Sequence, residues 1–387
     1  MAIDFDARQR EIYMDNAATT VIDDEVVAAM QPFLEERYGN PETPYHLGRE
    51  AKDGIEKARS QVAELVGCKP EEIYFTSGGT ESNNWAIKGL EMPTDKNLIV
   101  VSSIEHKSVL EPVAWMGRRS LASVRIVPVD ALGLIRLDSI ESYLKEGSAG
   151  LVSIQYANNE VGTLQPIDDI GEICKKYGVI FHTDAVQAFG KININASAVD
   201  MASLSAHKIH GPMGVGALYV KGGTNLEPLL HGGGHESGMR SGTHGVPQII
   251  GFGKAAELAW SKMRTEMTRI SNMVEFLAGE MRVKLGAVRN GDPKNRLPNI
   301  LNMTLPNIDA SLVSGILNRY GICVATGAAC ATREGTSHVL RAMGRSITDC
   351  SATLRISLSR FNNEKESSLL VSYLQVALAD AKKRTLV

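Results

Sequence analysis

Residues 201–220 read MASLSAHKIHGPMGVGALYV, and Lys208 is the one formally charged residue in this stretch. A small-residue strand pattern precedes the lysine, and a glycine-rich turn follows it. An ammonium group among Ser, Ala, Met, Val and Gly is poorly solvated, which lowers the pKa of the amine. A neutral amine attacks carbonyl carbon and forms a Schiff base. The alternative for Lys208 is a side chain whose charged end reaches water or a distant acid.

Around this stretch, apolar runs rich in β-branched residues alternate with helical patterns from about residue 60 to residue 220. The expected strands are EEIYFTS (71–77), KNLIVVSS (96–103), SVRIVPVD (123–130), AGLVSIQYA (149–157), GVIFHTDA (178–185) and GVGALYV (214–220). Strands that are apolar on both faces are typical of a mostly parallel sheet covered by helices, and ligands of such sheets bind at the carboxyl ends of the strands. We therefore predict an α/β fold whose site lies on the loops that follow strands.

The character of the sequence changes after residue 250. The pattern predicts a long amphipathic helix over 254–285, then short strands at ILNMTL (300–305), ICVATG (322–327) and TLRISLS (353–359), and a final helix. We predict a smaller α+β domain formed by residues 1–14 and 261–387, beside a large domain over residues 15–260. Because no internal repeat or long linker is present, we expect the two domains to pack together around a cleft.

Composition limits the class of partner. The 387 residues carry a formal net charge of -3 with Lys and Arg scattered, so we expect neither a nucleic-acid groove nor a membrane-binding face. The first residues have acids where a signal peptide needs cations, and no stretch approaches 18 apolar residues, which indicates a soluble cytoplasmic protein. The cysteines at 68, 174, 323, 330 and 350 are odd in number and form no CxxC pair. We therefore predict neither a disulfide framework nor a metal site.

The stretch IYFTSGGTESNNWAIKG (73–89) combines a strand, a tight turn and a helix whose first turn has free backbone N–H groups. Such groups bind anions, so we predict that Gly79 and Thr80 help to hold a phosphate. The stretch lacks the GK[ST] of a P-loop and the GxGxxG of a dinucleotide fold, which argues against a nucleotide. The alternative is an ordinary helix start with Thr80 as the N-cap.

Polar residues follow three other expected strands. Asp184 stands at a strand end with Gln187 three positions later, and an ionised Asp suits a pyridinium nitrogen, with helix capping as the alternative. His106 can stack on a flat ring or shuttle a proton, although a satisfied surface histidine fits the local sequence as well. Asn158 and Asn159 can donate to a phenolate oxygen or merely mark a turn.

Cys330 lies in GICVATGAACATREGTSHVLRAMG (321–344), among Thr, Gly and Ala residues. Too few large side chains surround it to bury the thiol, and an accessible thiolate is a strong nucleophile. Cys323 in the same stretch has the pattern of a core residue. The alternative for Cys330 is an inert loop thiol.

Together, Lys208, Asp184, His106 and the turn at Gly79 and Thr80 indicate a pyridoxal-phosphate site. With these residues in place, the sequence resembles the NifS/IscS-type cysteine desulfurases, of the class V aminotransferase family of fold-type I pyridoxal-phosphate enzymes. The matching motifs are YMDNAATT (13–20), YGNP (38–41), FTSGGTESNN (75–84), EHKSVL (105–110), NNEVGTLQPI (158–167), HTDAVQAFGK (182–191), SAHKIHGPMGVG (205–216), GGGHESGMRSGT (232–243), RLPNILN (296–302), TGAAC (326–330), SHVLRAMG (337–344) and LRISLSRF (354–361). The likeness covers nearly the whole chain.

The resemblance implies a role for each matching residue. Lys208 forms the Schiff base with the cofactor, Asp184 pairs with the pyridine nitrogen, and His106 stacks on the ring. The other implied cofactor contacts are Gln187 and Asn159 at the phenolic oxygen, Gly79, Thr80, Ser205 and His207 at the phosphate, and Thr243 at the phosphate of the neighbouring subunit. Arg355 grips the substrate carboxylate with help from Asn40.

The resemblance also implies conversion of L-cysteine to L-alanine. The Cys330 thiolate attacks the substrate sulfur and keeps it as a persulfide, while Lys208 and His106 carry protons. A homodimer with shared active sites is implied, as is a sulfur acceptor such as an iron–sulfur scaffold or a tRNA-thiolation protein. The cysteine loop departs from the usual pattern, because it reads GAAC where many relatives have GSAC.

Three other functions stay open at this point. The same cofactor supports a selenocysteine lyase or another aminotransferase-like reaction, and Cys330 favours the desulfurase over these. An inactive scaffold in a sulfur-transfer complex would lack the visible absorbance of the cofactor. A nicotinamide-dependent oxidoreductase is disfavoured because no GxGxxG follows an early strand.

Overall fold

The computed structural model describes residues 11–93, 95–326 and 336–385, and in them the chain forms one large and two small β-sheets. The large sheet has the strand order β2-β8-β7-β6-β5-β3-β4. Its strands are β2 (Ile73–Thr76), β3 (Leu98–Ser102), β4 (Ser123–Val127), β5 (Ala149–Ser153), β6 (Ile180–Asp184), β7 (Met201–Ser205) and β8 (Gly216–Val220). Strands β4, β3, β5, β6 and β7 are parallel, whereas β8 is antiparallel to both β7 and β2. This mostly parallel mixed sheet confirms the predicted α/β class.

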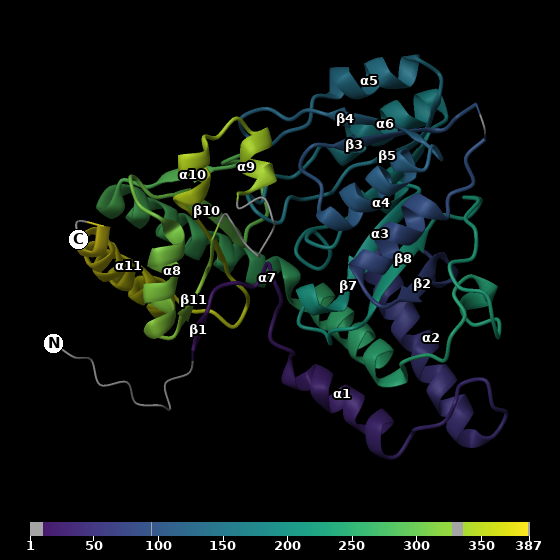
Figure 1. Ribbon diagram of the computed structural model, residues 1–387. Coiled ribbons are helices and arrows are strands. Elements are labelled where there is room, and N and C mark those ends of the chain that lie inside the picture. The colour runs from purple at the N-terminus through teal and green to yellow at the C-terminus, as the bar shows by residue number, and fades with distance from the viewer. Residues whose placement is uncertain (1–10, 94, 327–335, 386–387) are drawn as a thin grey trace.

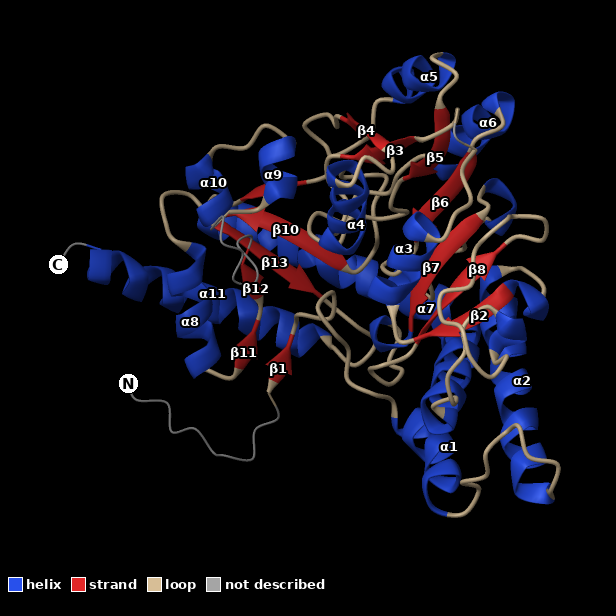
Figure 2. Ribbon diagram, turned by 45° about the vertical axis from the view of Figure 1, so that its right-hand side comes forward, coloured by secondary structure: helices blue, strands red, loops and turns tan. Residues whose placement is uncertain are grey.

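Helices cover both faces of the large sheet (Figures 1 and 2). They are α2 (His46–Val66), α3 (Gly79–Lys88), α4 (Lys107–Arg118), α5 (Leu137–Lys145), α6 (Ile167–Tyr177) and α7 (Val246–Leu285), while α1 (Asp24–Glu35) packs on α7. On one face, Trp85 of α3 packs in an apolar cluster with Ile99 of β3. On the other, Val62 of α2 and Phe252 of α7 share a cluster with Val100. The side chains of the adjacent residues Ile99 and Val100 therefore point to opposite faces of the sheet, as strand geometry requires.

A second unit lies beside the large sheet and contains the first described strand and the last described helix (Figure 1). Its antiparallel sheet has the order β12-β13-β10-β9, and β1 pairs with β11 in a separate two-stranded sheet. Its elements are β1 (Ile12–Tyr13), β9 (Val288–Asn290), β10 (Ile300–Thr304), α8 (Ala310–Arg319), β11 (Ile322–Cys323), β12 (Ala325–Thr326), α9 (His338–Ala342), α10 (Ile347–Ser351), β13 (Thr353–Ser357) and α11 (Glu364–Thr385).

The 40-residue helix α7 connects the two units. Phe252, in its first half, belongs to the apolar core of the large sheet, and Met273, in its second half, belongs to the core of the second unit. Met14 joins that second core as well. These two cores support the division near residue 260, which we retain as a proposal.

Two element boundaries differ from those predicted. Helix α7 begins at Val246 rather than at residue 254, because Pro247 occupies the first turn, where its missing N–H costs nothing. The single strand expected over 322–327 divides at Val324 into β11, which pairs with β1, and β12, which pairs with β13. In the described parts of the chain, no helix is both long and apolar enough to cross a bilayer.

Phe252 provides a test of the core. It is fully buried and meets Phe75 and Phe189 edge-on, at ring-centroid distances of 6.3 and 5.9 Å. Phe252→Ala removes these contacts and leaves a cavity, so we expect the free energy of unfolding to fall by about 3–5 kcal/mol. Guanidinium unfolding followed by circular dichroism measures this loss. Phe276→Ala, at an exposed position of the same helix, is the control and is expected to change stability by less than about 0.5 kcal/mol. Equal effects would contradict the placement of Phe252 in the core.

Candidate active site

The segments that follow the parallel strands meet at one edge of the large sheet. His106 follows β3, Asn159 follows β5, Asp184 ends β6 and Lys208 follows β7. With the N-terminus of α3, these segments line a cavity of about 420 Å³. The predicted residues that line the cavity are Gly79, Thr80, His106, Asn159, Asp184, Gln187, Ser205, His207, Lys208 and Arg355.

Lys208 ends a short helical turn, η3 (Ala206–Lys208), in the connection from β7 to β8. Its Nζ donates hydrogen bonds to the backbone oxygens of Ala17 (2.7 Å) and Ala18 (2.6 Å), so neither of these partners is a carboxylate. Burial, followed by the positive charge of Arg355, lowers the pKa of Lys208 from 10.5 to about 8, although nearby carboxylates oppose the shift. Lys208 therefore has a larger neutral fraction at physiological pH than a solvated lysine.

A chain of hydrogen bonds connects Asp184 to His106. Asn83 Nδ2 donates to Asp184 Oδ2 (2.8 Å) and to Ser108 Oγ (2.8 Å). Ser108 Oγ in turn lies 2.7 Å from His106 Nδ1. The backbone N–H of Val186 donates to Asp184 Oδ1 (3.0 Å), so each carboxylate oxygen accepts one hydrogen bond and retains a further lone pair.

His106 is the N-cap of α4 and has a defined tautomer. The backbone N–H of Ser108 donates to His106 Nδ1 (3.1 Å), and a nitrogen that accepts such a bond carries no proton. The proton of the neutral ring is therefore on Nε2. Burial lowers the pKa of His106, while the Asp184 carboxylate acts in the opposite direction. The ring forms part of the cavity wall, which favours a role in the site over that of a satisfied surface histidine.

The turn before α3 brings backbone N–H groups to the cavity. Gly78 is the N-cap with φ +149°, a conformation that suits glycine. A Cβ at Gly79 would lie 2.6 Å from Val186 Cγ2, so a larger residue would force that side chain to move. The helix begins at Gly79, and the alternative with Thr80 as N-cap is therefore wrong. The first N–H groups of the helix have no acceptor within it and are available to a ligand.

Ser205 and His207 line the same cavity. His207 Nδ1 lies 3.1 Å from Thr19 Oγ1. Burial lowers the pKa of His207 to about 4, and the positive charge of Lys208 acts in the same direction. An anion in this part of the cavity thus meets a hydroxyl, a neutral imidazole and backbone N–H groups.

Arg355 extends from β13, in the second unit, to the cavity that the large sheet forms. Its guanidinium donates to Asp15 Oδ1 (2.7 Å) and to the backbone oxygen of Asn159 (3.0 Å). These contacts use two of the five N–H donors of an arginine. The buried Nε of Arg355 is without a partner among the described residues.

Gln187 binds the N-terminal segment. Its Nε2 donates to the backbone oxygen of Ala17 (2.9 Å), which also accepts from Lys208. Its buried Oε1 has no hydrogen-bond partner in the described part of the chain. Buried amide oxygens are normally paired, so this atom indicates that the cavity receives a further polar group.

Three predicted residues are not brought into this cavity. Thr243 is exposed in the loop before α7, and Asn40 is exposed in the loop before α2; neither lines the cavity. Cys330 lies outside the described residues. The predicted roles of these three residues stay predictions.

The sequence interpretation missed Asn83, Ser108 and Asp15, which bind residues of the site, and Glu105, which supports the cavity wall from behind through Gln155. Glu105 does not itself line the cavity. It is fully buried directly before His106, and its Oε1 accepts from Ser102 Oγ (2.6 Å) and from the N–H of Gln155 (2.9 Å). Burial raises the pKa of Glu105 to about 8. An acid in the short segment between an apolar strand and His106 was the signal that could have found it.

Comparison with known proteins places this architecture in a family. Residues 12–370 match the class-V aminotransferase family, and the chain belongs to it. Curated relatives carry a more specific name. A cysteine desulfurase IscS of Dictyoglomus turgidum is 40% identical over 373 residues, which cover 95% of this chain and 94% of the relative. A cysteine desulfurase of Sinorhizobium fredii is 43% identical over 363 residues, which cover 92% and 94%.

Solved structures agree with this assignment. A NifS-like protein superposes with a TM-score of 0.90 at 39% identity, covering 95% of this chain and 99% of that one. SspA in complex with cysteine superposes with a TM-score of 0.79 at 35% identity, covering 91% of this chain and 100% of that one.

Enzymes of this family depend on pyridoxal phosphate, and the residues of the cavity fit that group. Asp184 offers a carboxylate with free lone pairs to a pyridinium nitrogen, and Lys208 offers an amine of lowered pKa to an aldehyde. The first turn of α3 offers N–H groups to a phosphate. The unpaired oxygen of Gln187 is a further polar group for which a ligand would supply a partner.

The lowered pKa of Lys208 can be measured directly. The neutral fraction of an amine rises with pH, so we expect an acylating reagent to modify Lys208 of the cofactor-free protein with a rate midpoint at about pH 8. Mass spectrometry of Lys208-containing peptides at a series of pH values measures the rate. N-acetyl-lysine amide in the same reactions is the reference, with an expected midpoint at about pH 10.4. A midpoint that matches the reference would contradict the shift.

Proposed function

We propose that this chain is a pyridoxal-phosphate-dependent cysteine desulfurase, which converts L-cysteine to L-alanine and transfers the sulfur to Cys330. The observation that carries the proposal is the convergence of Lys208, Asp184, His106 and Arg355 on one cavity. Similarity over more than nine tenths of the chain to relatives named cysteine desulfurase supports the reaction. The complex of the similar protein SspA with cysteine supports the substrate.

When bound, pyridoxal phosphate supplies an electron sink that eases removal of the α-proton of an amino acid. In this proposal, Asp184 holds the ring nitrogen protonated, and Asn83 and the N–H of Val186 keep its carboxylate oriented. The proposed phosphate contacts are the N–H groups of Gly79 and Thr80, Ser205 Oγ and His207, with Thr243 contributed by a second copy. Gln187 and Asn159 would contact the phenolic oxygen.

Two residues move protons in the proposed reaction. Lys208 is the base at the α-carbon, since a pKa near 8 lets its amine accept and return a proton at physiological pH. His106 exchanges protons through Nε2, because its Nδ1 accepts from Ser108. His106 would also stack on the ring of the bound cofactor.

Arg355 is the proposed carboxylate site for the substrate. Its remaining N–H donors form a fork that suits two carboxylate oxygens. The bonds to Asp15 and to the oxygen of Asn159 hold the guanidinium plane in place before substrate arrives. Asn40 is proposed to assist this contact.

Cys330 is the proposed sulfur acceptor within the enzyme. Its thiolate forms a bond to the substrate sulfur, the carbon–sulfur bond breaks, and the electron pair of that bond goes to the β-carbon, which takes up a proton. Overall, a Cys330 thiol and cysteine become a Cys330 persulfide and alanine, so that atoms and electrons balance. We further propose that an iron–sulfur scaffold or a tRNA-thiolation protein accepts this sulfur, and that the enzyme acts as a homodimer.

Cys330→Ala separates cofactor binding from sulfur transfer. We expect this variant to keep the visible absorbance of the bound cofactor and to lose sulfide and alanine production from L-cysteine, because the acceptor thiol is gone. Visible spectra before and after addition of L-cysteine, with assays of both products, measure this. Cys68→Ala, which changes a partly buried cysteine away from the cavity, is the control and is expected to remain active. Undiminished sulfide release from Cys330→Ala would overturn the role of Cys330.

Arg355→Lys tests carboxylate recognition. Lysine keeps the charge and loses the planar fork, so one charge-assisted hydrogen bond is lost and we expect KM for L-cysteine to rise about 10- to 100-fold. Steady-state alanine production measures KM and kcat. Arg289→Lys in β9, which exchanges an arginine paired with Glu275, is the control and is expected to leave KM unchanged. An unchanged KM in Arg355→Lys would remove Arg355 from the substrate site.

A further inference from the structure

A second polar cavity lies away from the active site, between the loop that precedes α2 and the loop that precedes α7. We propose that Glu42, His235 and His244 bind one divalent cation of the zinc class in this cavity. The proposed desulfurase reaction does not use these residues, and none of them lines the active-site cavity. The prediction that the chain has no metal site considered cysteine spacing and not these residues.

The three residues lie close enough to share an ion. One ligand atom from each lies within 4.8 Å of the others, and among the residues that the structure describes they form the one such group of three. They line a cavity of about 420 Å³. Tetrahedral zinc requires ligand atoms about 3.4 Å apart, so the group must close slightly around the ion. Glu42 is exposed and its side chain is free to make this movement.

One ring nitrogen of His244 has no hydrogen-bond partner in the described part of the chain. Its Nε2 lies 2.7 Å from Glu236 Oε1, and its Nδ1 is buried without a hydrogen-bond partner. The side chain is only 10% exposed, so bulk water has little access to Nδ1 as a hydrogen-bond partner. Glu236 accepts hydrogen bonds from Arg59 through both oxygens, so this carboxylate is the acceptor in its contact with His244. The proton of His244 is therefore on Nε2, and Nδ1 is the free ligand atom.

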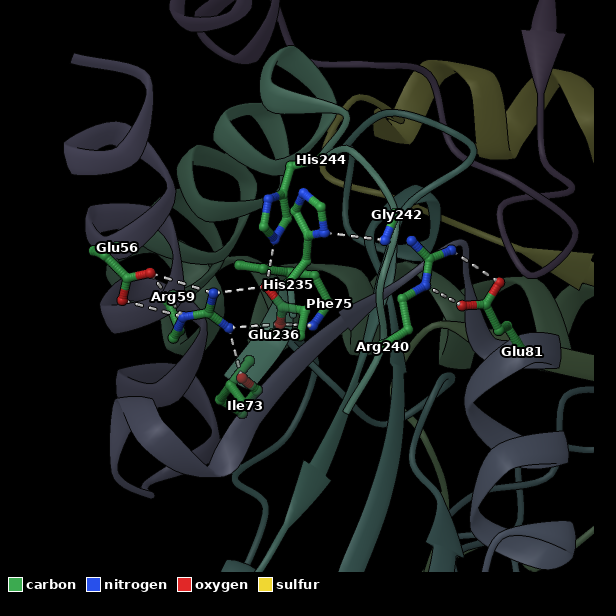
Figure 3. A network of polar contacts seen from close by, with 10 residues as sticks. All are labelled: Glu56, Arg59, Ile73, Phe75, Glu81, His235, Glu236, Arg240, Gly242 and His244. Carbon is green, nitrogen blue, oxygen red and sulfur yellow. Dashed lines mark hydrogen bonds and ion pairs between the residues drawn. The ribbon is translucent and has the colours of Figure 1, made fainter. Parts of the chain in front are cut away.

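The orientation of His244 is set by a buried ion pair (Figure 3). Both oxygens of Glu236 bind the Arg59 guanidinium at 2.8 Å, and the N–H of Phe75 donates to Oε2 at 2.7 Å. Metal-ligating histidines commonly donate their second N–H to a carboxylate that fixes the ring. Glu236 already provides this support for His244.

His235 faces His244 across the group, with ring centroids 5.3 Å apart (Figure 3). Its Nδ1 accepts from the N–H of Gly242 at 3.2 Å, so the proton of the neutral ring is on Nε2 while this bond persists. Coordination through Nε2 moves the ring proton to Nδ1 and breaks the bond to Gly242. That N–H is exposed, so water replaces the lost contact at little cost.

The charge and chemistry of the cavity favour zinc over Mg²⁺ or Ca²⁺. Two imidazole nitrogens and one carboxylate oxygen are ligands that suit Zn²⁺ and similar transition metals, and they leave a fourth position for water. The charged residues that line the cavity are the acids Glu42, Glu56, Glu71 and Glu236, and the bases Lys52 and Arg59. This excess of acids attracts a cation. A bound ion would tie the loop before α2 to the loop that carries Thr243.

The test uses the full-length, cofactor-loaded protein, stripped of metal by a chelator and then dialysed. Equilibrium dialysis against ZnCl₂ measures the zinc bound per chain and its affinity. The test variants are Glu42→Gln and His235→Gln, which change residues that are at least partly exposed. Glu71→Gln is the matched control, because Glu71 lines the same cavity outside the group of three. Circular dichroism verifies that all four proteins are folded.

We expect the unmodified protein and Glu71→Gln to bind one zinc ion more per chain than the two test variants. The affinity at this site is expected to fall on the order of 100-fold or more when either ligand is replaced. Zinc held by cysteines alone would bind equally to all four proteins and would overturn the proposal. An equal loss in Glu71→Gln would also overturn it, since the effect would then reflect general charge. Both readouts are independent of desulfurase activity, so they stand whether or not the proposed function is correct.

Discussion

The placement of one amine away from bulk water is the constraint on which the site depends. Lys208 lies at the carboxyl edge of the large sheet, and its Nζ is held by the backbone oxygens of Ala17 and Ala18. Backbone oxygens accept hydrogen bonds without supplying the full negative charge that would stabilise an ammonium ion. A carboxylate in the same position would raise the pKa of the amine and remove its reactivity at neutral pH.

The hydrogen bonds around Asp184 orient its carboxylate without adding positive charge near Lys208. In the proposed function, this carboxylate pairs with the cofactor close to a lysine that reacts in its neutral form. The side chain of Asn83 and the N–H of Val186 satisfy one lone pair on each oxygen without adding a cation. The same Asn83 reaches Ser108, which holds the tautomer of His106. The side-chain amide of Asn83 therefore links the orientation of the Asp184 carboxylate to that of the His106 ring.

Local sequence patterns predicted the strands of the large sheet and the polar residues that follow them. This was possible because each strand and the loop after it are adjacent in the sequence. Asp184 and Lys208 were found in this way. Asp15 and Arg355 are 340 positions apart, so no local pattern pairs them. The backbone oxygens of Ala17 and Ala18 carry no side-chain signal at all. These contacts depend on how the N-terminal segment lies across both units, which only the folded chain reveals.

Helix α7 has a thermodynamic consequence for the chain as a whole. Its two halves belong to different hydrophobic cores, one under the large sheet and one in the second unit. If one core unfolded, the apolar face of one half of α7 would be exposed to water. The other core would then be left with a helix that is only partly packed. The two units therefore form a single cooperative block despite their separate sheets. Neither half of the polypeptide is suited to persist as an autonomous fragment after proteolysis.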